Sequence, residues 1–488
     1  MAGIDEAVDA AVAPLAQGLS ALIFAELPIA GVGVPLVVLW LVAAGVFFTL
    51  RLGFVSIRGF PLALGLVSGR RTTVGVGATA SGQVSHFQAL ATAVSGTVGI
   101  GNIGGVAIAI SMGGPGAAFW LLVAGMLGMS TKFAECTLGV RYRRELADGT
   151  VSGGPMYYLE HGLAEMGRVR LGRALGLFYA AGIVIGCMGI GNMFQSNQAF
   201  VQFVGVTGGE TSWFADKGWL FGLAMALLVG VVIIGGIRSI ARVTQVIVPF
   251  MAVLYLLTAG IVILLNAEAL PWAIAHIFSD AFTGQAAAGG ALGALVIGFQ
   301  RAVFSNEAGI GSASIAHSAV RTDQPASEGY VALLEPFIDT VVICMFTALV
   351  IITTRYFEPG FGADLDGIAM TSAAFARVVP FFPPLLALAA MLFAFSTMLA
   401  WSYYGMKGWT YLVGESARAE TGFKIVFCAF VMLGAMIQLG AVLDFSDAMV
   451  FVICVPNILG LYLLAPRVRE EMARYGEFRR RQGLEDAP

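Results

Sequence analysis

Two long hydrophobic segments of this chain are interrupted by the same short glycine pattern. The first interruption covers residues 98–102 (VGIGN) and the second covers residues 308–312 (AGIGS). Glycine exposes backbone polar groups and disfavours a continuous helix. Within a bilayer, such groups are tolerated only where they are buried in protein or line a wet cavity. Two interrupted helices in corresponding halves of a chain therefore indicate the central binding site of a secondary transporter.

The composition of the chain excludes an ordinary soluble fold. Of its 488 residues, 58% are hydrophobic and only 12% are charged, whereas about 25% are charged in soluble domains. The mean hydropathy is +0.85, which is typical of a polytopic membrane protein. The five cysteines all fall in apolar segments and form no close-spaced pair, so we expect neither disulfides nor a zinc site.

The apolar stretches predict an all-α membrane protein with about eleven transmembrane helices. The connections 10–30, 152–168, 268–286 and 366–379 are predicted as loops or surface helices. Lys and Arg gather in every second connection, which places the N-terminus outside and the C-terminus in the cytoplasm. The predicted spanning segments are roughly 32–52, 86–111, 115–140, 174–205, 217–237, 243–266, 291–315, 331–354, 382–406, 422–441 and 447–465.

The positions of the two interrupted segments predict an internal repeat. Once the first segment is set aside, each interrupted helix opens a set of five segments, and the second set must run opposite to the first across the membrane. We therefore expect a five-plus-five inverted repeat. The predicted organisation is an N-terminal segment with one extra helix (1–80), a transporter core (81–466) with repeats at about 81–266 and 288–466, and a basic cytoplasmic tail (467–488).

Each interruption exposes helix ends that can bind ions and small zwitterions. Helix N-termini present N–H groups with partial positive charge, and C-termini present carbonyls with partial negative charge. The first attracts a carboxylate and the second a small cation. Ile100, Gly101 and Asn102 offer such groups at the first break, and Ser305 and Asn306 offer neutral oxygens at the second. Oxygens of this kind suit a partly dehydrated Na⁺.

Two further helices carry polar or aromatic groups at membrane depth. Four amide side chains fall within residues 192–198, and Gln195 and Asn197 cannot both face one direction. We favour Gln195 for the binding site and a packing role for Asn197. Thr397 and Trp401 are four residues apart and share one helix face, where a hydroxyl and an indole could bind a cation or cap a pocket.

Ionisable residues inside predicted membrane segments are functional hypotheses by default. Lys132 and Glu135 are three residues apart on one helix, and we predict that they form a structural pair. Arg301 and Glu307 flank the second break and could pair with each other, pair with Asp339, or take part in gating. Glu307 is also a candidate for proton coupling.

Motifs of enzymes and ATP-driven pumps are absent from the sequence. It contains no nucleotide-binding P-loop, no His/Glu metal motif and no nucleophile elbow. His86 and His317 lie near predicted cytoplasmic helix ends, and we interpret both as structural. We expect no enzymatic activity, no organic cofactor and no nucleic-acid partner.

Several longer motifs resemble those of the alanine or glycine:cation symporter family of amino acid transporters. The resemblance extends over roughly residues 80–465 and is specific. The stretches that carry it are Phe87–Ala93, Thr97–Ile103, Gly113–Trp120, Gly128–Glu135, Gly153–Tyr158, Phe304–Gly309, Phe395–Thr397 and Trp401–Tyr404.

This resemblance implies the fold of the sodium-coupled leucine and neurotransmitter transporters and Na⁺-driven uptake of a small amino acid such as alanine or glycine. It implies that the substrate is held by both breaks, by Gln195, and by the positions of Thr397 and Trp401. Two departures stand out. Ile100 occupies a position where the family often has Thr, and Leu122 replaces the second Trp of a Phe-Trp-Met-Trp signature. The first departure leaves the exact substrate open.

These observations predict an inner-membrane symporter that binds a small zwitterionic amino acid and Na⁺ at the midplane. Bulky aromatic side chains would leave room only for a small substrate. A proton-coupled transporter or exchanger is the alternative, and a channel or sensor without coupled transport is a third. The predicted substrate site comprises Ile100, Gly101, Asn102, Gln195, Phe299, Phe304, Ser305, Thr397 and Trp401. The predicted Na⁺ ligands are Thr97, Val98, Ser396 and Thr397, with a second ion near Asn102 and Asn306.

Overall fold

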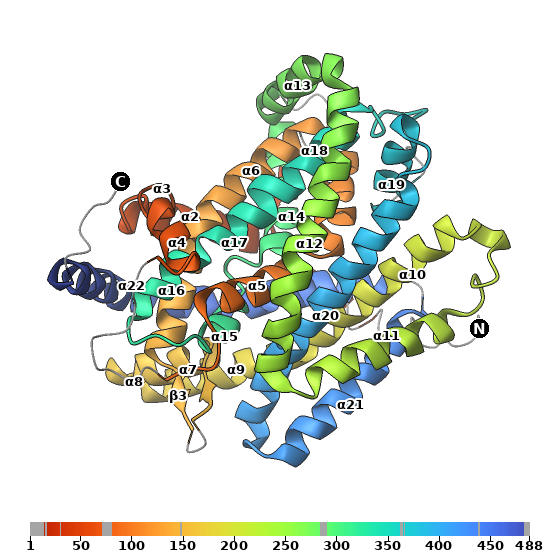
Figure 1. Ribbon diagram of the computed structural model, residues 1–488. Coiled ribbons are helices and arrows are strands. Elements are labelled where there is room, and N and C mark those ends of the chain that lie inside the picture. Colours follow the sequence, from red (N-terminus) through yellow and green to blue (C-terminus); the bar gives the residue numbers. More distant parts are fainter. Residues whose placement is uncertain are drawn as a thin grey trace.

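Helices make up nearly all of the described chain, and only two short antiparallel strand pairs accompany them (Figure 1). This computed structural model describes residues 14, 17–29, 31–70, 81–146, 149–283, 290–361, 365, 367–437 and 440–482, with the side chains of 440–444 excepted. Residues 1–13 of the predicted N-terminal segment and 483–488 of the predicted tail therefore lie outside the described residues.

The first part of the chain is almost entirely helical. Up to the end of the first predicted half, the elements are β1 (Glu26–Ile29), β2 (Val32–Pro35), α2 (Leu36–Arg51), α3 (Val55–Arg58), α4 (Phe60–Val67), α5 (His86–Thr97), η1 (Ile100–Asn102), α6 (Gly104–Arg141), β3 (Arg144–Glu145), β4 (Val151–Ser152), α7 (Pro155–Tyr157), η2 (Tyr158–Gly162), α8 (Leu163–Glu165), α9 (Val169–Met188), η3 (Gly189–Met193), α10 (Phe194–Val206), η4 (Gly209–Thr211), α11 (Gly218–Ile233) and α12 (Gly236–Leu265).

The second part of the chain is also helical. Its elements are η5 (Ala267–Ala269), α13 (Leu270–Thr283), α14 (Gly290–Asn306), α15 (Ala313–His317), α16 (Pro325–Ala332), α17 (Leu334–Pro336), η6 (Phe337–Cys344), α18 (Met345–Thr353), α19 (Gly367–Val378), α20 (Pro383–Val413), α21 (Ala417–Gly434) and α22 (Gly440–Arg481).

The surface of α12 shows why these helices belong in a membrane. Its outward face exposes large apolar side chains such as Val246, Phe250 and Leu257, whereas Met251 and Tyr255 on the other face are buried. An exposed apolar face of this size is typical of a helix that contacts lipid or another protein. Among the described residues, six helical stretches are long and apolar enough to cross a membrane: Ile100–Arg141, Val169–Val206, Gly236–Leu265, Pro325–Thr353, Pro383–Val413 and Phe445–Arg481.

Each of the eleven predicted segments coincides with one or more helices, although the number of membrane crossings stays a prediction. The second and third predicted segments meet inside α6. There Gly114 has φ 64° and ψ −173°, which is far from helical, and Pro115 follows it. Glycine tolerates this conformation without a side-chain clash, so α6 consists of two helices joined at a sharp kink.

The two predicted breaks are present and differ in geometry. At the first, α5 ends at Thr97, Val98 and Gly99 are extended, and a single 3₁₀ turn leads into α6. At the second, α14 ends at Asn306, and positive φ angles follow at Glu307 (57°), Gly309 (95°) and Gly311 (85°). The backbone polar groups of both stretches need partners outside a helical ladder.

Two groups of packed helices enclose the breaks. In one group, α6 packs against α14, α15, α16 and α18; in the other, α20 packs against α9, α10, α12 and α21. Helix α5 contacts α15 of the first group and both α12 and α20 of the second. Figure 1 shows α12 and α20 running side by side through the centre of the molecule. The first break therefore lies where the groups meet.

A backbone junction joins the start of α5 to the end of α15. Val84 and Val320 form a parallel β-bridge, and the Arg321 N–H donates to the Val84 carbonyl (2.9 Å). The Arg143 guanidinium crosses this junction and donates to the carbonyls of four residues at 2.6–3.1 Å: Ser81, Ser318, Val320 and Thr322.

The two histidines interpreted as structural lie beside the same junction. His86 at the start of α5 and His317 at the end of α15 both contact the carboxylate of Glu328 in α16. All three side chains are buried or nearly so. One carboxylate thus ties together three helix segments.

Replacing Arg143 should weaken the junction. Arg143→Met keeps an apolar stem but removes every donor, and hydrogen bonds to charged groups contribute about 1.5–3 kcal/mol each. We expect the free energy of unfolding to fall by about 3 kcal/mol or more, measured by denaturant titration of the detergent-solubilised protein. The matched control is Arg474→Met, because Arg474 is 64% exposed and pairs with Glu471 on its own helix. Equal midpoints for both variants would contradict the structural role.

Candidate substrate and sodium site

The first break is held by side chains that bond directly to its backbone. The Gly99 N–H donates to Asn102 Oδ1 (2.8 Å), and the Ile100 N–H donates to Gln195 Oε1 (3.2 Å). A Cβ atom at Gly99 would lie 2.7 Å from Thr397 Oγ1, which is too close for any side chain. Glycine is therefore required where α5, α10 and α20 converge.

The amide-rich segment of η3 and α10 divides as predicted. Gln195 faces the first break, while Asn197 packs against the end of α21 and the residues after it, donating to the carbonyls of Gly434 (3.3 Å) and Ile437 (2.5 Å). Asn192 also bonds to a backbone carbonyl of α21. Asn197 and Asn192 thus pack against α21, whereas the Gln198 amide donates to Asn197 Oδ1 (3.2 Å).

Thr397 is the predicted ion ligand that meets the first break. Its hydroxyl contacts the carbonyls of Ser95 (3.0 Å) and Val98 (3.4 Å) at the C-terminal end of α5. The Thr97 hydroxyl, in contrast, bonds back to carbonyls of its own helix. The Ser95 and Val98 carbonyls carry the partial negative charge of a helix C-terminus. Together with the Thr397 hydroxyl, they form a group of oxygens that suits Na⁺.

Ser396 is not part of that cluster. Its hydroxyl donates to the Phe393 carbonyl (3.0 Å) and contacts Met251 Sδ (3.4 Å) on α12. Adjacent residues on a helix point about 100° apart, so only one of Ser396 and Thr397 faces α5 here. The structure thus brings the Thr397 hydroxyl, and not that of Ser396, to the α5 carbonyls, and Na⁺ binding by either residue stays a prediction.

A second group of oxygens lies around Asp339 in η6. The Asp339 carboxylate accepts hydrogen bonds from Asn102 Nδ2 (2.5 Å), Ser305 Oγ (2.9 Å) and Thr340 Oγ1 (2.7 Å). All four side chains are buried. The sequence marked Asp339 as a charge at membrane depth but assigned it no role. Its contacts with both breaks could not be read from spacing along the chain.

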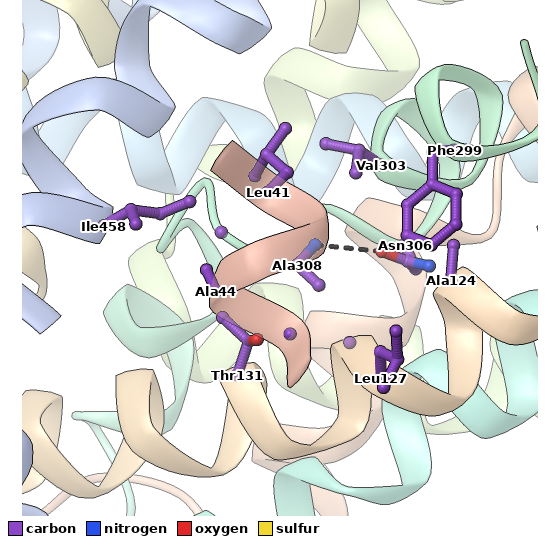
Figure 2. Close-up of a pocket in the computed structure, with 13 residues that line it drawn as sticks. Leu41, Ala44, Ala124, Leu127, Thr131, Phe299, Val303, Asn306, Ala308 and Ile458 are labelled. Carbon is purple, nitrogen blue, oxygen red and sulfur yellow. Dashed lines mark hydrogen bonds between the residues drawn. The ribbon is translucent and has the colours of Figure 1, made fainter. Parts of the chain in front are cut away.

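Asn306 lies beside this group without touching Asn102. It donates to Thr340 Oγ1 (2.9 Å), and its own oxygen accepts from the Ala308 N–H (3.0 Å), as Figure 2 shows. Thr340 and Asp339 thus separate the two asparagines that were predicted to share an ion. Asn306 instead caps the second break much as Asn102 caps the first.

Two aromatic side chains of the predicted pocket contact the breaks. Trp401 is fully buried, and its indole N–H donates to Glu307 Oε1 (2.9 Å) at the second break. A Cβ atom at Gly101 would lie 3.4 Å from the Phe304 ring, so Phe304 covers the first break. Phe304 also packs edge-on against Phe194.

Phe299 lies elsewhere. It lines a cavity between α2, α6, α14 and the second break, together with Leu41, Val303 and Asn306 (Figure 2). Neither Gln195 nor Thr397 lines this cavity. Phe304 follows Phe299 by five positions, which places the two side chains about 140° apart around α14. The structure therefore does not bring Phe299 to the first break with the other predicted substrate residues.

The structure pairs two buried basic residues with partners other than the predicted ones. Lys132 pairs with Glu335 across the helix interface (3.0 Å) instead of with Glu135 on its own helix. Arg301 pairs with Asp447 of α22 (2.6 Å) and with neither Glu307 nor Asp339. Among the described residues, Asp339 forms no ion pair with a basic side chain.

Comparison with known proteins identifies the family of this chain. The model of the sodium:alanine symporter family matches residues 24–487. The chain is 39% identical over 450 residues to the sodium/alanine symporter AgcS of Methanococcus maripaludis, which covers 92% of this chain and 96% of that protein. It is 32% identical over 443 residues to the probable sodium/glutamine symporter GlnT of Bacillus subtilis, covering 90% and 87%.

A solved structure identifies the fold independently. The crystal structure of MhsT in complex with L-phenylalanine aligns with 80% of this chain and 98% of its own, with a TM-score of 0.55 and 17% identity. This likeness confirms the predicted fold of the sodium-coupled leucine-transporter type. The chain is a multi-pass membrane transporter and not an enzyme, and it belongs to the sodium:alanine symporter family.

Proposed function

We propose that this protein couples inward movement of Na⁺ to the uptake of alanine or glycine by alternating access. The observation that carries the proposal is the convergence of Thr397, Gln195 and the Asp339 group on the first break. The name of the AgcS relative supports sodium and alanine. The transporter resides in the inner membrane, with its basic tail in the cytoplasm.

The substrate carboxylate binds at the first break. The Ile100 N–H donates to Gln195 Oε1, which takes the acceptor position that a carboxylate needs. A bound amino acid would replace Gln195 there, because a charged acceptor bonds more strongly than a neutral amide. The ammonium group binds carbonyls of the second break.

Side-chain size limits the substrate to a small amino acid. Phe304 covers Gly101, and the Trp401 ring fills the space beside Gly191, where even a Cβ atom would collide with it. Ile100 adds apolar bulk at the first break, where the family resemblance implies a hydroxyl. Alanine and glycine suit such a pocket because neither needs a polar partner for its side chain.

Two Na⁺ ions bind at this site. The first binds the α5 carbonyls and the Thr397 hydroxyl. The second binds the Asp339 carboxylate with oxygens of Asn102 and Ser305. A buried carboxylate without a basic partner is costly, so a cation at Asp339 is strongly favoured over an empty site.

Coupling arises because ions and substrate contact both groups of helices. Thr397 and Trp401 belong to α20, whereas Asp339 and Glu307 belong to the group around α6. A ligand shifts a conformational equilibrium only by its differential affinity for the two states. Na⁺ at these contacts therefore stabilises the arrangement that binds substrate.

Liposome uptake tests the function directly. Purified protein in liposomes should accumulate labelled alanine or glycine with an inward Na⁺ gradient and should not accumulate either when K⁺ replaces Na⁺. Accumulation without Na⁺ that follows a pH gradient would support the proton-coupled alternative. Flux that only equilibrates the substrate would indicate a channel and would overturn the proposal.

Removing the Thr397 hydroxyl should weaken the first ion site. Thr397→Ala is expected to raise the Na⁺ concentration for half-maximal uptake about tenfold, which corresponds to roughly 1.4 kcal/mol. Ser402→Ala is the matched control, since the Ser402 hydroxyl is buried in the same helix and bonds only to the Leu399 carbonyl among the described contacts. An unchanged Na⁺ requirement in Thr397→Ala would remove Thr397 from the ion site.

Neutralising Asp339 should abolish the second ion site while keeping its shape. With Asp339→Asn, the Na⁺ dependence of uptake should change from sigmoidal to hyperbolic, because only the Thr397 site remains. The curve is measured by varying Na⁺ at fixed alanine and constant ionic strength. If Asp339→Asn kept the wild-type curve, Asp339 would have no role in ion binding.

A further inference from the structure

A cluster of buried charges lies behind the second break and takes no part in the proposed ion and substrate sites. Lys132 and Glu135 come from α6 and Glu335 comes from α17, and all three side chains are fully buried. Lys132 Nζ contacts Glu335 Oε1 at 3.0 Å. Glu135 has no such partner, because its hydrogen bonds come from neutral groups.

Glu135 is attached to the backbone of the second break. Its Oε1 atom accepts the Gly309 N–H (2.9 Å) and the amide of Asn457 in α22 (2.9 Å). Asn457 also donates to the Gly309 carbonyl (2.8 Å) and accepts from the Tyr158 hydroxyl. Gly309 has a positive φ of 95°. Any rearrangement of this turn therefore changes the hydrogen bonds to Glu135.

The second oxygen of each carboxyl group is isolated. Among the described residues, Oε2 of Glu135 and Oε2 of Glu335 are buried and have no hydrogen-bond partner. A buried anionic oxygen without a partner is far more costly than a neutral one. Unpartnered atoms at this depth indicate that the cluster holds something that side chains alone do not supply.

The sum of the charges in the cluster also indicates that a positive charge is missing. The charged groups that interact with the cluster are one ammonium, that of Lys132, and three carboxyl groups, those of Glu135, Glu335 and Glu307. The other titratable neighbours of Glu135 are neutral as thiols or phenols: Cys136 of α6, Tyr158 of η2, Tyr179 of α9 and Cys454 of α22. Three ionised carboxylates would leave two uncompensated negative charges in the membrane interior.

A proton on Glu135 can supply one of the two missing positive charges. A proton can bind directly to the single unpartnered oxygen of Glu135. Glu307 already accepts from Trp401 and Ser312 through both of its oxygens, whereas Glu135 Oε2 is unoccupied by any donor.

We infer that Glu135 is a proton-binding site, separate from the Na⁺ and substrate sites, that exchanges its proton when the second break rearranges. The inference rests on the proposed transport cycle. With the turn in its observed position, Glu135 carries the proton on Oε2 while Oε1 accepts from Gly309 and Asn457. When the turn moves and water reaches Glu135, the O–H bond breaks and the proton passes to water; the carboxylate takes a proton back from water when the turn re-forms.

The direct test measures protons on the wild-type protein. Na⁺ and then alanine are added to detergent-solubilised protein in weak buffer containing a pH dye. We expect a proton change of about one per protein at most, and none in Glu135→Gln, which fixes a neutral side chain. His86→Gln is the control, because it removes a titratable group at Glu328 and should keep the proton change. No proton change in the wild-type protein with either addition would overturn the inference.

Uptake as a function of pH gives a second readout. With a constant Na⁺ gradient, wild-type uptake should vary several-fold between about pH 5.5 and pH 8.5, and Glu135→Gln should give a flat profile at lower rate. Glu135→Asp should restore a slope. A wild-type profile in Glu135→Gln would contradict the inference. Absence of Na⁺-driven uptake at every pH would instead contradict the proposed function, and the proton release on adding Na⁺ alone would still decide the role of Glu135.

Discussion

The structure depends on how the backbone of two broken helices is satisfied inside a membrane. Water is not available there, so each freed N–H or C=O group must find a protein partner. Asn102 and Gln195 accept from the first break, and Glu135 and Asn457 bond to the second. The long-range contacts between helices follow from this requirement. Polar side chains are costly in lipid, but here they form the hydrogen bonds that the backbone of the breaks lacks.

The same requirement connects structure to transport. A side chain that replaces water at a break can itself be replaced by a ligand with matching groups, as we propose for Gln195 and the substrate carboxylate. The breaks also lie where two groups of helices meet, because α5 contacts both. Thr397 on α20 and Asp339 on η6 approach the first break from opposite groups. Ligands at this point therefore sense the relative position of the two groups.

Residue patterns correctly predicted features that depend on local geometry, such as helix breaks and helix faces. They did not predict which residues from distant segments contact one another. The glycine patterns located both breaks, and helical periodicity separated Gln195 from Asn197. The pairing of Lys132 with Glu135 failed because a surface-type pair three residues apart contributes only about 0.2–0.5 kcal/mol, and Glu335 offers a fully buried partner. Periodicity also could not tell whether Ser396 or Thr397 faces α5, since that depends on the rotation of α20.

Charge balance explains why buried carboxylates sit at both breaks. Asp339 contacts the first break through Asn102, and Glu135 contacts the second through Gly309. Neither forms an ion pair with a basic side chain among the described residues, although Lys132 lies near Glu135. A permanent salt bridge at these positions would fix each break in one state. A carboxylate whose positive partner is a mobile cation or proton is stable only while that partner is bound. In the proposed transport cycle, the energetic cost of losing that partner links ion occupancy to the conformation of the break.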